Sequence, residues 1–365
     1  MLFAGQASAG AEPLPGRGWH SPQCAVVDSD GTLTYTTDGL RTAHATAGAV
    51  HATKYVYGIV ALSTPDHLLA IDSHGNLYLT RDAGCMWVQI NQVQGLYYPR
   101  LTAGPDGSAY IWGIHSNRVL RVTGTSMTEL PAATPDDGGD LVALAVDKHA
   151  PRHVRAVSET GQIYDSTNAG VHFVASGKPG IAARDSLYDA SIDPSNLNHV
   201  VLGSMGEGAY MTHNGGRTWS HTGMGAAGDK VNAFSMSISP ANGNVVYAQG
   251  LNLAENNANA PSEGRHIYQS KDGGRTFRAI VDADAMGGVF LQNGALLAPS
   301  PTDANRLYWV FSMSYGGYGT DLWSIDTRTG ERTLAHDNHP KLTAITFNPR
   351  DRAVMYLGFG YEQVS

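Results

Sequence analysis

The sequence predicts an all-β fold, a seven-bladed β-propeller whose four-stranded antiparallel blades are closed into a ring by strands from the N- and C-terminal parts of the chain. Three observations predict it. The chain has 365 residues, enough for one large all-β domain, and 43 of them are glycine, a share well above the average of about 7%. A short turn motif recurs, and strand-like segments divide the chain into units of similar length. So many glycines suit a fold with many tight turns.

The recurrent turn motif reads Ser/Thr-x-Asp/Asn-x-Gly-x-x-aromatic. Its clear copies span residues 80–87, 166–173, 212–219 and 270–277, and a degraded copy spans 36–39. The first two Asp/Asn positions are 86 residues apart, or two units of 43, and the next spacing is 46. The last spacing is 58, which is one unit plus an insertion. A strand-rich period in the forties is typical of a four-stranded propeller blade.

Each position of the motif has a structural task. The Asp or Asn side chain accepts backbone N–H groups a few residues on, and the Ser/Thr hydroxyl does the same from the strand end. Glycine supplies a positive φ, and the aromatic ring packs between sheets. We therefore expect Trp219 and Phe277, in the two best copies, to be buried. The predicted structural residues are Asp82, Trp87, Asn168, Phe173, Asn214, Trp219, Asp272 and Phe277.

Six full units can be assigned, and two partial units remain. The full units span residues 57–91, 97–130, 140–175, 186–222, 233–282 and 294–336. The C-terminal piece 342–360 supplies two strands, and the N-terminal piece around residues 32–47 supplies the others. Together they predict a seventh blade, and such closure removes the exposed sheet edges that invite aggregation.

Composition excludes several classes of partner. The formal net charge is −8, and no run of Lys or Arg is longer than two, so we expect no nucleic-acid partner. The sequence contains no stretch of about 18 apolar residues, so we expect no membrane span. The 15 histidines show no metal-ligand spacing, and we expect neither a metal nor a cofactor.

The first residues indicate export. Met1-Leu2-Phe3-Ala4 resembles the end of an apolar signal core, and Ala7-Ser8-Ala9 fits a small-x-small cleavage site. We interpret residues 1–20 as an incomplete signal peptide and flexible N-terminus, with the mature chain beginning near Gly10, and residues 21–365 as a single propeller domain. An ordinary flexible N-terminus is the alternative. Cys24 and Cys85 form either one disulfide, in an oxidising compartment, or two separate buried thiols.

The quoted motifs resemble Asp-box repeats, also called bacterial-neuraminidase repeats. These repeats occur in sialidases, some endoglucanases, sorting-receptor ectodomains and photosystem assembly factors. Because the box covers about eight residues of each blade, the resemblance implies a fold and says little about activity.

A closer resemblance lies in the last third of the chain. Segments 244–251, 260–268, 299–303 and 315–322 resemble the dispase autolysis-inducing proteins of actinobacteria. That resemblance implies a secreted, non-enzymatic, seven-bladed propeller. It also implies an extracellular metalloprotease as partner and a role as glutamine donor for transglutaminase, although it does not identify the reactive glutamines.

The alternative function is a sialidase-like or other glycoside hydrolase that acts on an extracellular glycan. The Arg-Ile-Pro string of sialidases is missing, and Pro99-Arg100-Leu101 is the nearest string, in the wrong order. Glycosidases need two carboxylates across a cleft, and nothing in the sequence pairs any two candidates. These candidates are Asp189, Glu207, Glu255, Glu263 and Asp321.

Propeller geometry places the candidate binding surface. Loops between second and third strands, and loops between blades, open on one face, while the recurrent turns close hairpins on the other. Long irregular stretches at 223–230, 252–264, 282–293 and 312–319 fall on the first face. Loops on a rigid scaffold often carry binding function. We therefore predict protein binding there, through Glu255, Glu263, Tyr315 and Tyr318, with Asp189 and Glu207 as further candidates.

Overall fold

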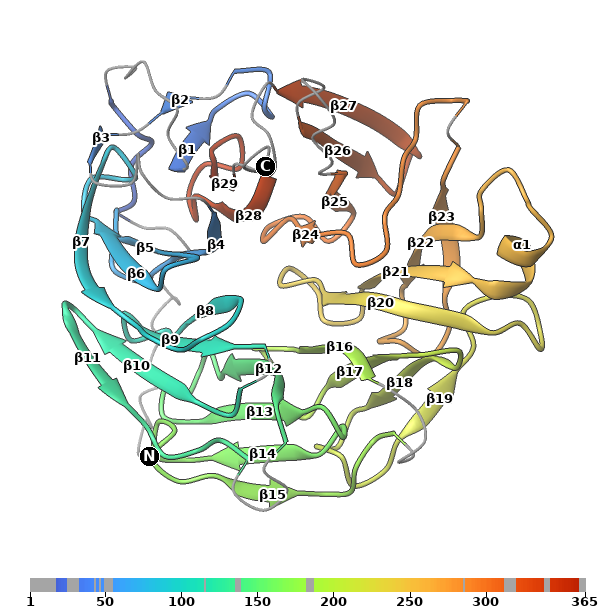
Figure 1. Ribbon diagram of the computed structural model, residues 1–365, viewed down its shortest axis with the longest axis horizontal. Helices are drawn as coiled ribbons and strands as arrows, with labels where there is room; N and C mark the ends of the chain where they lie inside the picture. Colours follow the sequence, from blue (N-terminus) through green and yellow to red (C-terminus); the bar gives the residue numbers. More distant parts are fainter. Residues whose placement is uncertain are drawn as a thin grey trace, which may run out of the picture.

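A computed structural model of the protein shows its β-sheets arranged in a ring around a central axis (Figure 1). The structure describes residues 18–24, 33–42, 44–45, 47–48, 55–114, 116–134, 139–181, 187–284, 286–311, 320–337 and 342–360. Within these residues the strands form six four-stranded sheets and one five-stranded sheet. The predicted seven-bladed propeller is confirmed.

Six blades are built from consecutive strands, each paired antiparallel with the next. Blade 1 comprises β4 (Val56–Ala61), β5 (Leu68–Asp72), β6 (Asn76–Thr80) and β7 (Met86–Gln92). Blade 2 comprises β8 (Pro99–Ala103), β9 (Ser108–Gly113), β10 (Val119–Thr123) and β11 (Ser126–Glu129). Blade 3 comprises β12 (Leu141–Val146), β13 (Val154–Ser158), β14 (Ile163–Ser166) and β15 (Val174–Ser176). Blade 4 comprises β16 (Leu187–Ile192), β17 (Val200–Ser204), β18 (Gly208–Thr212) and β19 (Ser220–Thr222). Blade 5 comprises β20 (Val231–Ile238), β21 (Val246–Asn252), β22 (Arg265–Ser270) and β23 (Arg278–Asp282). Blade 6 comprises β24 (Leu297–Pro299), β25 (Arg306–Phe311), β26 (Thr320–Asp326) and β27 (Glu331–Asp337). A short helix, α1 (Leu253–Asn257), lies between β21 and β22.

Blade 7 joins the two ends of the chain. Its inner strands are β28 (Leu342–Phe347) and β29 (Met355–Phe359), and its outer strands are β1 (Leu33–Thr36) and β2 (His44–Ala45). β1 pairs antiparallel with β29, so that Leu33 lies opposite Gly358 and Thr36 opposite Met355. A two-residue strand, β3 (Ala47–Gly48), pairs parallel with the outer edge of β7. The predicted closure by both ends is therefore present.

The recurrent turns share one hydrogen-bond pattern. In blade 1 the Thr80 hydroxyl donates to Asp82 over 2.6 Å and accepts the N–H of Gly84 over 3.1 Å. The Asp82 carboxylate accepts the N–H of Met86 over 3.0 Å. Equivalent bonds form at residues 166–172, 212–218 and 270–276. The degraded copy in blade 7 forms them too, because Thr36 and Asp38 are present.

Burial of the motif aromatics differs from the expectation. Trp87 and Phe173 are buried. Trp219 and Phe277 are only half-buried, so the prediction that both are buried is wrong. Trp219 packs against the edge of the core between blades 3 and 4, and its indole N–H donates to the Lys178 carbonyl over 2.9 Å.

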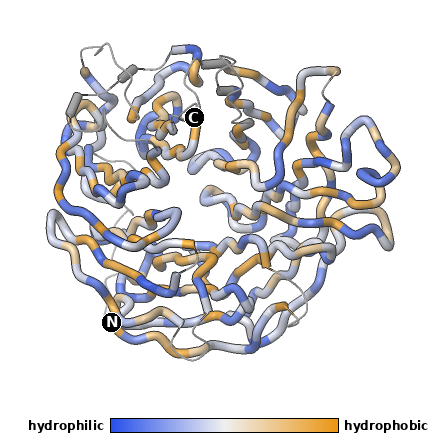
Figure 2. The backbone as a smooth tube through the Cα atoms, viewed as in Figure 1, coloured by the Kyte–Doolittle hydropathy of each residue, from blue (hydrophilic) through white to orange (hydrophobic). Residues whose placement is uncertain are grey.

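The core lies between adjacent blades, whose facing sheets share their buried side chains. Tyr110 and Trp112 of blade 2, for example, pack with Leu144 and Tyr164 of blade 3. Hydrophobic residues gather along the strands and hydrophilic ones at many of the turns (Figure 2). Burial of each such side chain contributes about 1.5–3 kcal/mol, and this packing makes the ring a rigid scaffold.

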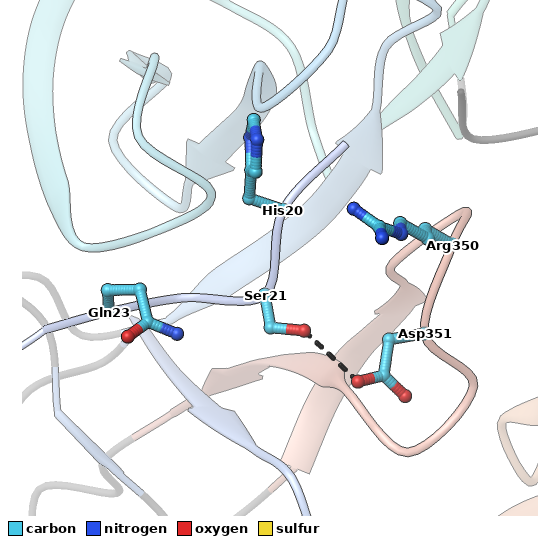
Figure 3. Close-up of a pocket in the computed structure, with 5 residues that line it drawn as sticks. All are labelled: His20, Ser21, Gln23, Arg350 and Asp351. Carbon is cyan, nitrogen blue, oxygen red and sulfur yellow. Dashed lines mark hydrogen bonds between the residues drawn. The ribbon is translucent and has the colours of Figure 1, made fainter. Parts of the chain in front are cut away.

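A segment that we call the N-terminal strap, residues 18–24, joins blade 7 to blade 1. Its Trp19 is buried in the core between these blades. The side chain of Asn348 donates to the His20 carbonyl over 2.8 Å, and the Ser21 hydroxyl donates to Asp351 over 3.0 Å. Figure 3 shows the Ser21–Asp351 bond beside Arg350.

The strap ends in a covalent link. Cys24 forms a disulfide with Cys85, which lies in the recurrent turn of blade 1. Of the two alternatives that the sequence leaves open, the structure shows the disulfide. Because the strap also bonds to blade 7, it holds the two blades at the junction where the ring closes.

Candidate binding face and channel

Two kinds of loop share one face of the propeller, which we call the loop face. Turns between second and third strands and connections between blades open on it, and the recurrent turns lie on the opposite face. Glu207 lies in the β17–β18 turn, and Glu255 and Glu263 lie in the β21–β22 loop, which includes α1. Asp189 lies near the start of β16. Tyr315 and Tyr318 lie outside the described residues.

The β21–β22 loop is ordered by its own polar side chains. Asn252 caps α1, since its side-chain oxygen accepts the backbone N–H of Ala254 over 3.0 Å. Its amide nitrogen donates to Asp229, in the neighbouring loop, over 2.8 Å. Asn252 itself is buried. These bonds connect two loops of the loop face into one unit.

Glu255 takes part in the same network. Its Oε2 lies 2.9 Å from Nε2 of His266 and accepts the Ser262 hydroxyl over 2.8 Å. The other ring nitrogen of His266 lies 2.7 Å from Oδ1 of Asp282. Glu255 therefore has a structural role, because its carboxylate holds the loop to β22. The same side chain is also partly exposed.

Glu263 and Glu207 are more available to a partner. Glu263 is exposed, and its carboxylate pairs with Arg265 at the surface. The Glu207 side chain is half-exposed, and its carboxylate lies 4.0 Å from His221. The β23–β24 loop adds two exposed apolar side chains, Met286 and Phe290, which the sequence analysis did not single out.

A cavity of about 620 Å³ lies at the centre of the ring, lined by residues of the inner strands and of the segments that precede them. Five inner strands have a β-bulge near the loop face, which adds one residue to each strand. Bulges re-aim side chains, and these turn a set of residues toward the channel mouth. The added residues are Tyr57, Val142, Tyr188, Phe234 and Thr343.

Aromatic rings line this mouth in two pairs. The ring centroids of Tyr188 and Phe234 lie 4.5 Å apart, and those of Tyr57 and Tyr98 lie 5.3 Å apart. Tyr98 is 55% exposed and Tyr188 is 36% exposed, so both rings are open to a partner. Sequence reasoning missed these residues because the bulges that bring them together come from strands far apart in the chain.

The described residues that line the channel include two charged groups, Arg100 and Asp189. The Asp189 carboxylate accepts the backbone N–H of Met236 over 2.8 Å. Burial raises the pKa of this carboxyl, and the Arg100 guanidinium and the Met236 N–H act in the opposite direction. Arg100 lies over the Trp112 ring, 5.8 Å from its centroid. The two charges influence each other but make no direct ion pair.

A second cavity, of about 540 Å³, lies between the strap and the turn after β28, lined by the residues of Figure 3. Its polar groups are largely engaged in holding the strap, which favours a structural role. Among the described residues, no three His, Cys, Asp or Glu side chains are arranged to hold a metal ion. No helix in the described part of the chain is long and apolar enough to cross a membrane.

Comparison with known proteins places these features in context. No family model matches the chain. The dispase autolysis-inducing protein of Streptomyces mobaraensis is 41% identical over 349 residues, which cover 95% of this chain and 91% of that protein. The similarity therefore covers nearly the whole chain and is not confined to the segments in its last third.

Solved structures share the architecture at low identity. The GH74 enzyme of Niastella koreensis matches with a TM-score of 0.59 and 16% identity, over 84% of this chain and 51% of that chain. YCF48 of Cyanidioschyzon merolae matches with a TM-score of 0.58 and 14% identity, over 84% and 96%. A structure of YCF48 bound to D1 peptide matches with a TM-score of 0.56 and 16% identity, over 92% and 99%. These likenesses support the fold alone.

Proposed function

Because the chain belongs to the dispase autolysis-inducing protein family, we propose that it is a secreted, non-enzymatic propeller that binds an extracellular metalloprotease through its loop face. The related protein is named for inducing autolysis of dispase, and YCF48, a propeller of the same fold, was solved with a peptide. The Cys24–Cys85 disulfide supports an oxidising, extracellular location. We propose also that residues 21–365 form a single domain and that the recurrent turns are Asp-boxes.

The observation that carries the proposal is the pre-organised loop face. The bonds of Asn252, Glu255 and His266 fix the β21–β22 loop before any partner arrives. A loop that is already ordered loses less conformational entropy on binding. The same face offers Glu263 as a charged contact and Met286 as an apolar one. Large exposed side chains on a rigid scaffold are typical of protein-binding surfaces.

The channel does not favour a glycoside hydrolase. Hydrolysis of a glycosidic bond needs two carboxyl groups, about 5–10 Å apart, on either side of the bond. Among the described residues that line the channel, Asp189 is the single carboxylate. The other charged side chain that lines the channel is the cation Arg100, which cannot serve as the second acid.

The glutamine-donor role depends on exposed glutamines. Gln23, Gln89, Gln92 and Gln94 are exposed, whereas Gln249 and Gln269 are buried among strands. Within the described residues, we propose the exposed group as the donors. Incubation with transglutaminase and a primary-amine probe, followed by peptide mass mapping, tests this; labelling confined to Gln249 or Gln269 would contradict it.

The binding proposal is tested with variants of the two tyrosines that the sequence predicts as binding residues. The double substitution of Tyr315 and Tyr318 to Ala should weaken binding to immobilised dispase at least about tenfold, since aromatic anchors often dominate interfaces. The melting temperature should stay nearly unchanged. Val171→Ala, at an exposed position within the recurrent turn of blade 3, is the control and should bind like the parent. Unchanged binding by the double variant, or hydrolysis of a sialoside or glucan by the purified chain, would overturn the proposal.

A further inference from the structure

We propose that the central channel binds a peptide segment that carries one acidic and one basic side chain, with the acid on Arg100 and the base on Asp189. This inference rests on the proposed function and deepens it, because it assigns part of the protein partner to a defined cavity. The volume of about 620 Å³ lies within the range of about 300–1,000 Å³ that is typical of ligand pockets.

Asp189 is exceptional for its position. It directly follows the bulge of β16, and the residues that directly follow the bulge in four other inner strands are small: Gly58, Ala143, Ser235 and Ala344. A carboxylate in this layer is costly to desolvate, and an apolar or small residue would serve packing equally well. The Asp189 carboxylate accepts the Met236 N–H of the next blade over 2.8 Å, but a neutral hydroxyl can make such a bond, as Ser191 does with the Ile238 N–H over 3.0 Å. The interblade bond therefore does not require the negative charge.

Arg100 provides the opposite charge without neutralising Asp189. Its guanidinium makes no hydrogen bond or ion pair with the described residues, and it is held over Trp112 by a cation–π contact. Arg100 is near enough to Asp189 to counteract the rise in the pKa of that carboxyl. Its guanidinium nitrogens lie more than 4.0 Å from the carboxylate oxygens, so the two groups form no direct ion pair. Arg100 comes from blade 2 and Asp189 from blade 4, and Val142 of the intervening blade 3 lines the same cavity.

This arrangement selects a ligand with two unlike charges. A purely anionic ligand would face Asp189, a purely cationic one would face Arg100, and either would meet repulsion. A dipolar ligand satisfies both, since a guanidinium binds a carboxylate through charge-assisted hydrogen bonds and Asp189 can accept an ammonium. Apolar atoms between the charges can pack on Tyr188 and Phe234 at the mouth. Unlike charges joined by apolar atoms are peptide chemistry, whereas a neutral glycan has neither charge.

The experiment uses two peptides and the full chain. Binding of acetyl-Glu-Leu-Lys-amide and its neutral counterpart acetyl-Gln-Leu-Gln-amide is measured by calorimetry at low and high salt. The charged peptide should bind at least about tenfold more tightly, and added salt should reduce this preference. Arg100→Gln and Asp189→Asn should each abolish the preference. The control is Arg121→Gln, in the same blade as Arg100. This arginine pairs with Asp106 over 2.9 Å instead of facing the channel.

A second variant protects the test against misfolding. Val142→Trp keeps both charges and fills part of the channel mouth, which the partly exposed Val142 lines, so it should block both peptides. Equal binding of the two peptides, or an unchanged preference in Arg100→Gln and Asp189→Asn, would overturn the proposal. Dispase binding is measured with the same variants. Loss of the channel site with dispase binding intact would leave the proposed function standing, whereas peptide binding without any dispase binding would contradict the proposed function alone.

Discussion

The Thr343 hydroxyl, in the last inner strand, donates a hydrogen bond over 2.5 Å to the carbonyl of Val56, in the first inner strand. This bond joins the blade completed by the chain ends to blade 1, beside the channel. Similar bonds link other neighbouring blades: Ser235 donates to the Ala295 carbonyl over 2.9 Å. Side-chain bonds of inner strands thus add to the apolar packing that holds the ring together.

Thr343→Val should destabilise the protein by about 1 kcal/mol, because it removes the hydroxyl and leaves the Val56 carbonyl without this donor while nearly keeping side-chain volume. Urea unfolding measures the effect. Thr333→Val, on the exposed outer strand β27, is the matched control and should change the midpoint little. Equal effects of the two variants would show that the interblade bond contributes nothing.

Replacement of Cys24 and Cys85 by Ser should lower stability by about 2–4 kcal/mol, since the disulfide closes a loop between positions 61 residues apart and restricts the unfolded chain. Thermal unfolding with and without a reductant measures this. The parent protein should lose stability on reduction, and the double variant should not respond. A parent protein that is insensitive to full reduction would contradict the role given to the strap.

The repeating parts of the fold could be predicted from sequence because their chemistry is local. Thr80 and Asp82 bond within their own turn, so the spacing of these turns alone reports the blades. Even the degraded copy in blade 7 forms the turn, although Leu40 adopts a φ of 70° where the other copies have glycine. Local polar bonds are sufficient to override that unfavourable angle.

The channel could not be predicted because it depends on alignment between distant strands. Arg100 and Asp189 are 89 positions apart, and neither belongs to a motif. Only the bulges and the ring geometry place them in one cavity. Burial of the motif aromatics likewise depends on the neighbouring blade. A Cβ at Gly180 would lie 2.8 Å from the Trp219 ring, so the packing of this half-buried ring requires glycine in the adjacent connection.

The difference in burial predicts an order of stability effects. Trp87→Ala should cost about 3–5 kcal/mol, because the ring is buried in the core between blades 7 and 1. Phe277→Ala should cost markedly less, since its ring is half-buried. Guanidinium titration of both variants tests the order, and a larger loss for Phe277→Ala would contradict the assigned packing.

Acid should destabilise the protein through His213. Its ring stacks on His199 with centroids 4.3 Å apart, and burial, His199 and Arg275 lower the pKa of His213. The folded state then binds fewer protons than the unfolded state, so stability falls as the pH drops through the unperturbed value of about 6.5. His213→Phe should flatten the dependence of unfolding free energy on pH below 7. His149→Phe, at an exposed turn, should leave it unchanged.

The last prediction concerns His266, which orders the β21–β22 loop. The ring is buried, with 6% of its side chain exposed, and each nitrogen faces a carboxylate. A neutral imidazole has one N–H and donates to either Glu255 or Asp282, whereas the doubly protonated ring donates to both. His266→Phe keeps the ring volume and removes both bonds. Because Asp282 is 67% exposed and water screens that pair, the loss should be modest, about 1–2 kcal/mol.

The local effect of His266→Phe should exceed its global one. Without the His266 bonds, Glu255 keeps Ser262 and Asn252 as partners, so α1 should still form but open more often. Hydrogen–deuterium exchange should therefore accelerate in residues 253–264 and stay unchanged in β4 and β12. Glu263→Gln, in the same loop, removes an exposed charge that pairs with Arg265 at the surface, so it should not alter exchange. Equal protection of the loop in parent and His266→Phe would mean that capping by Asn252 is sufficient to order it.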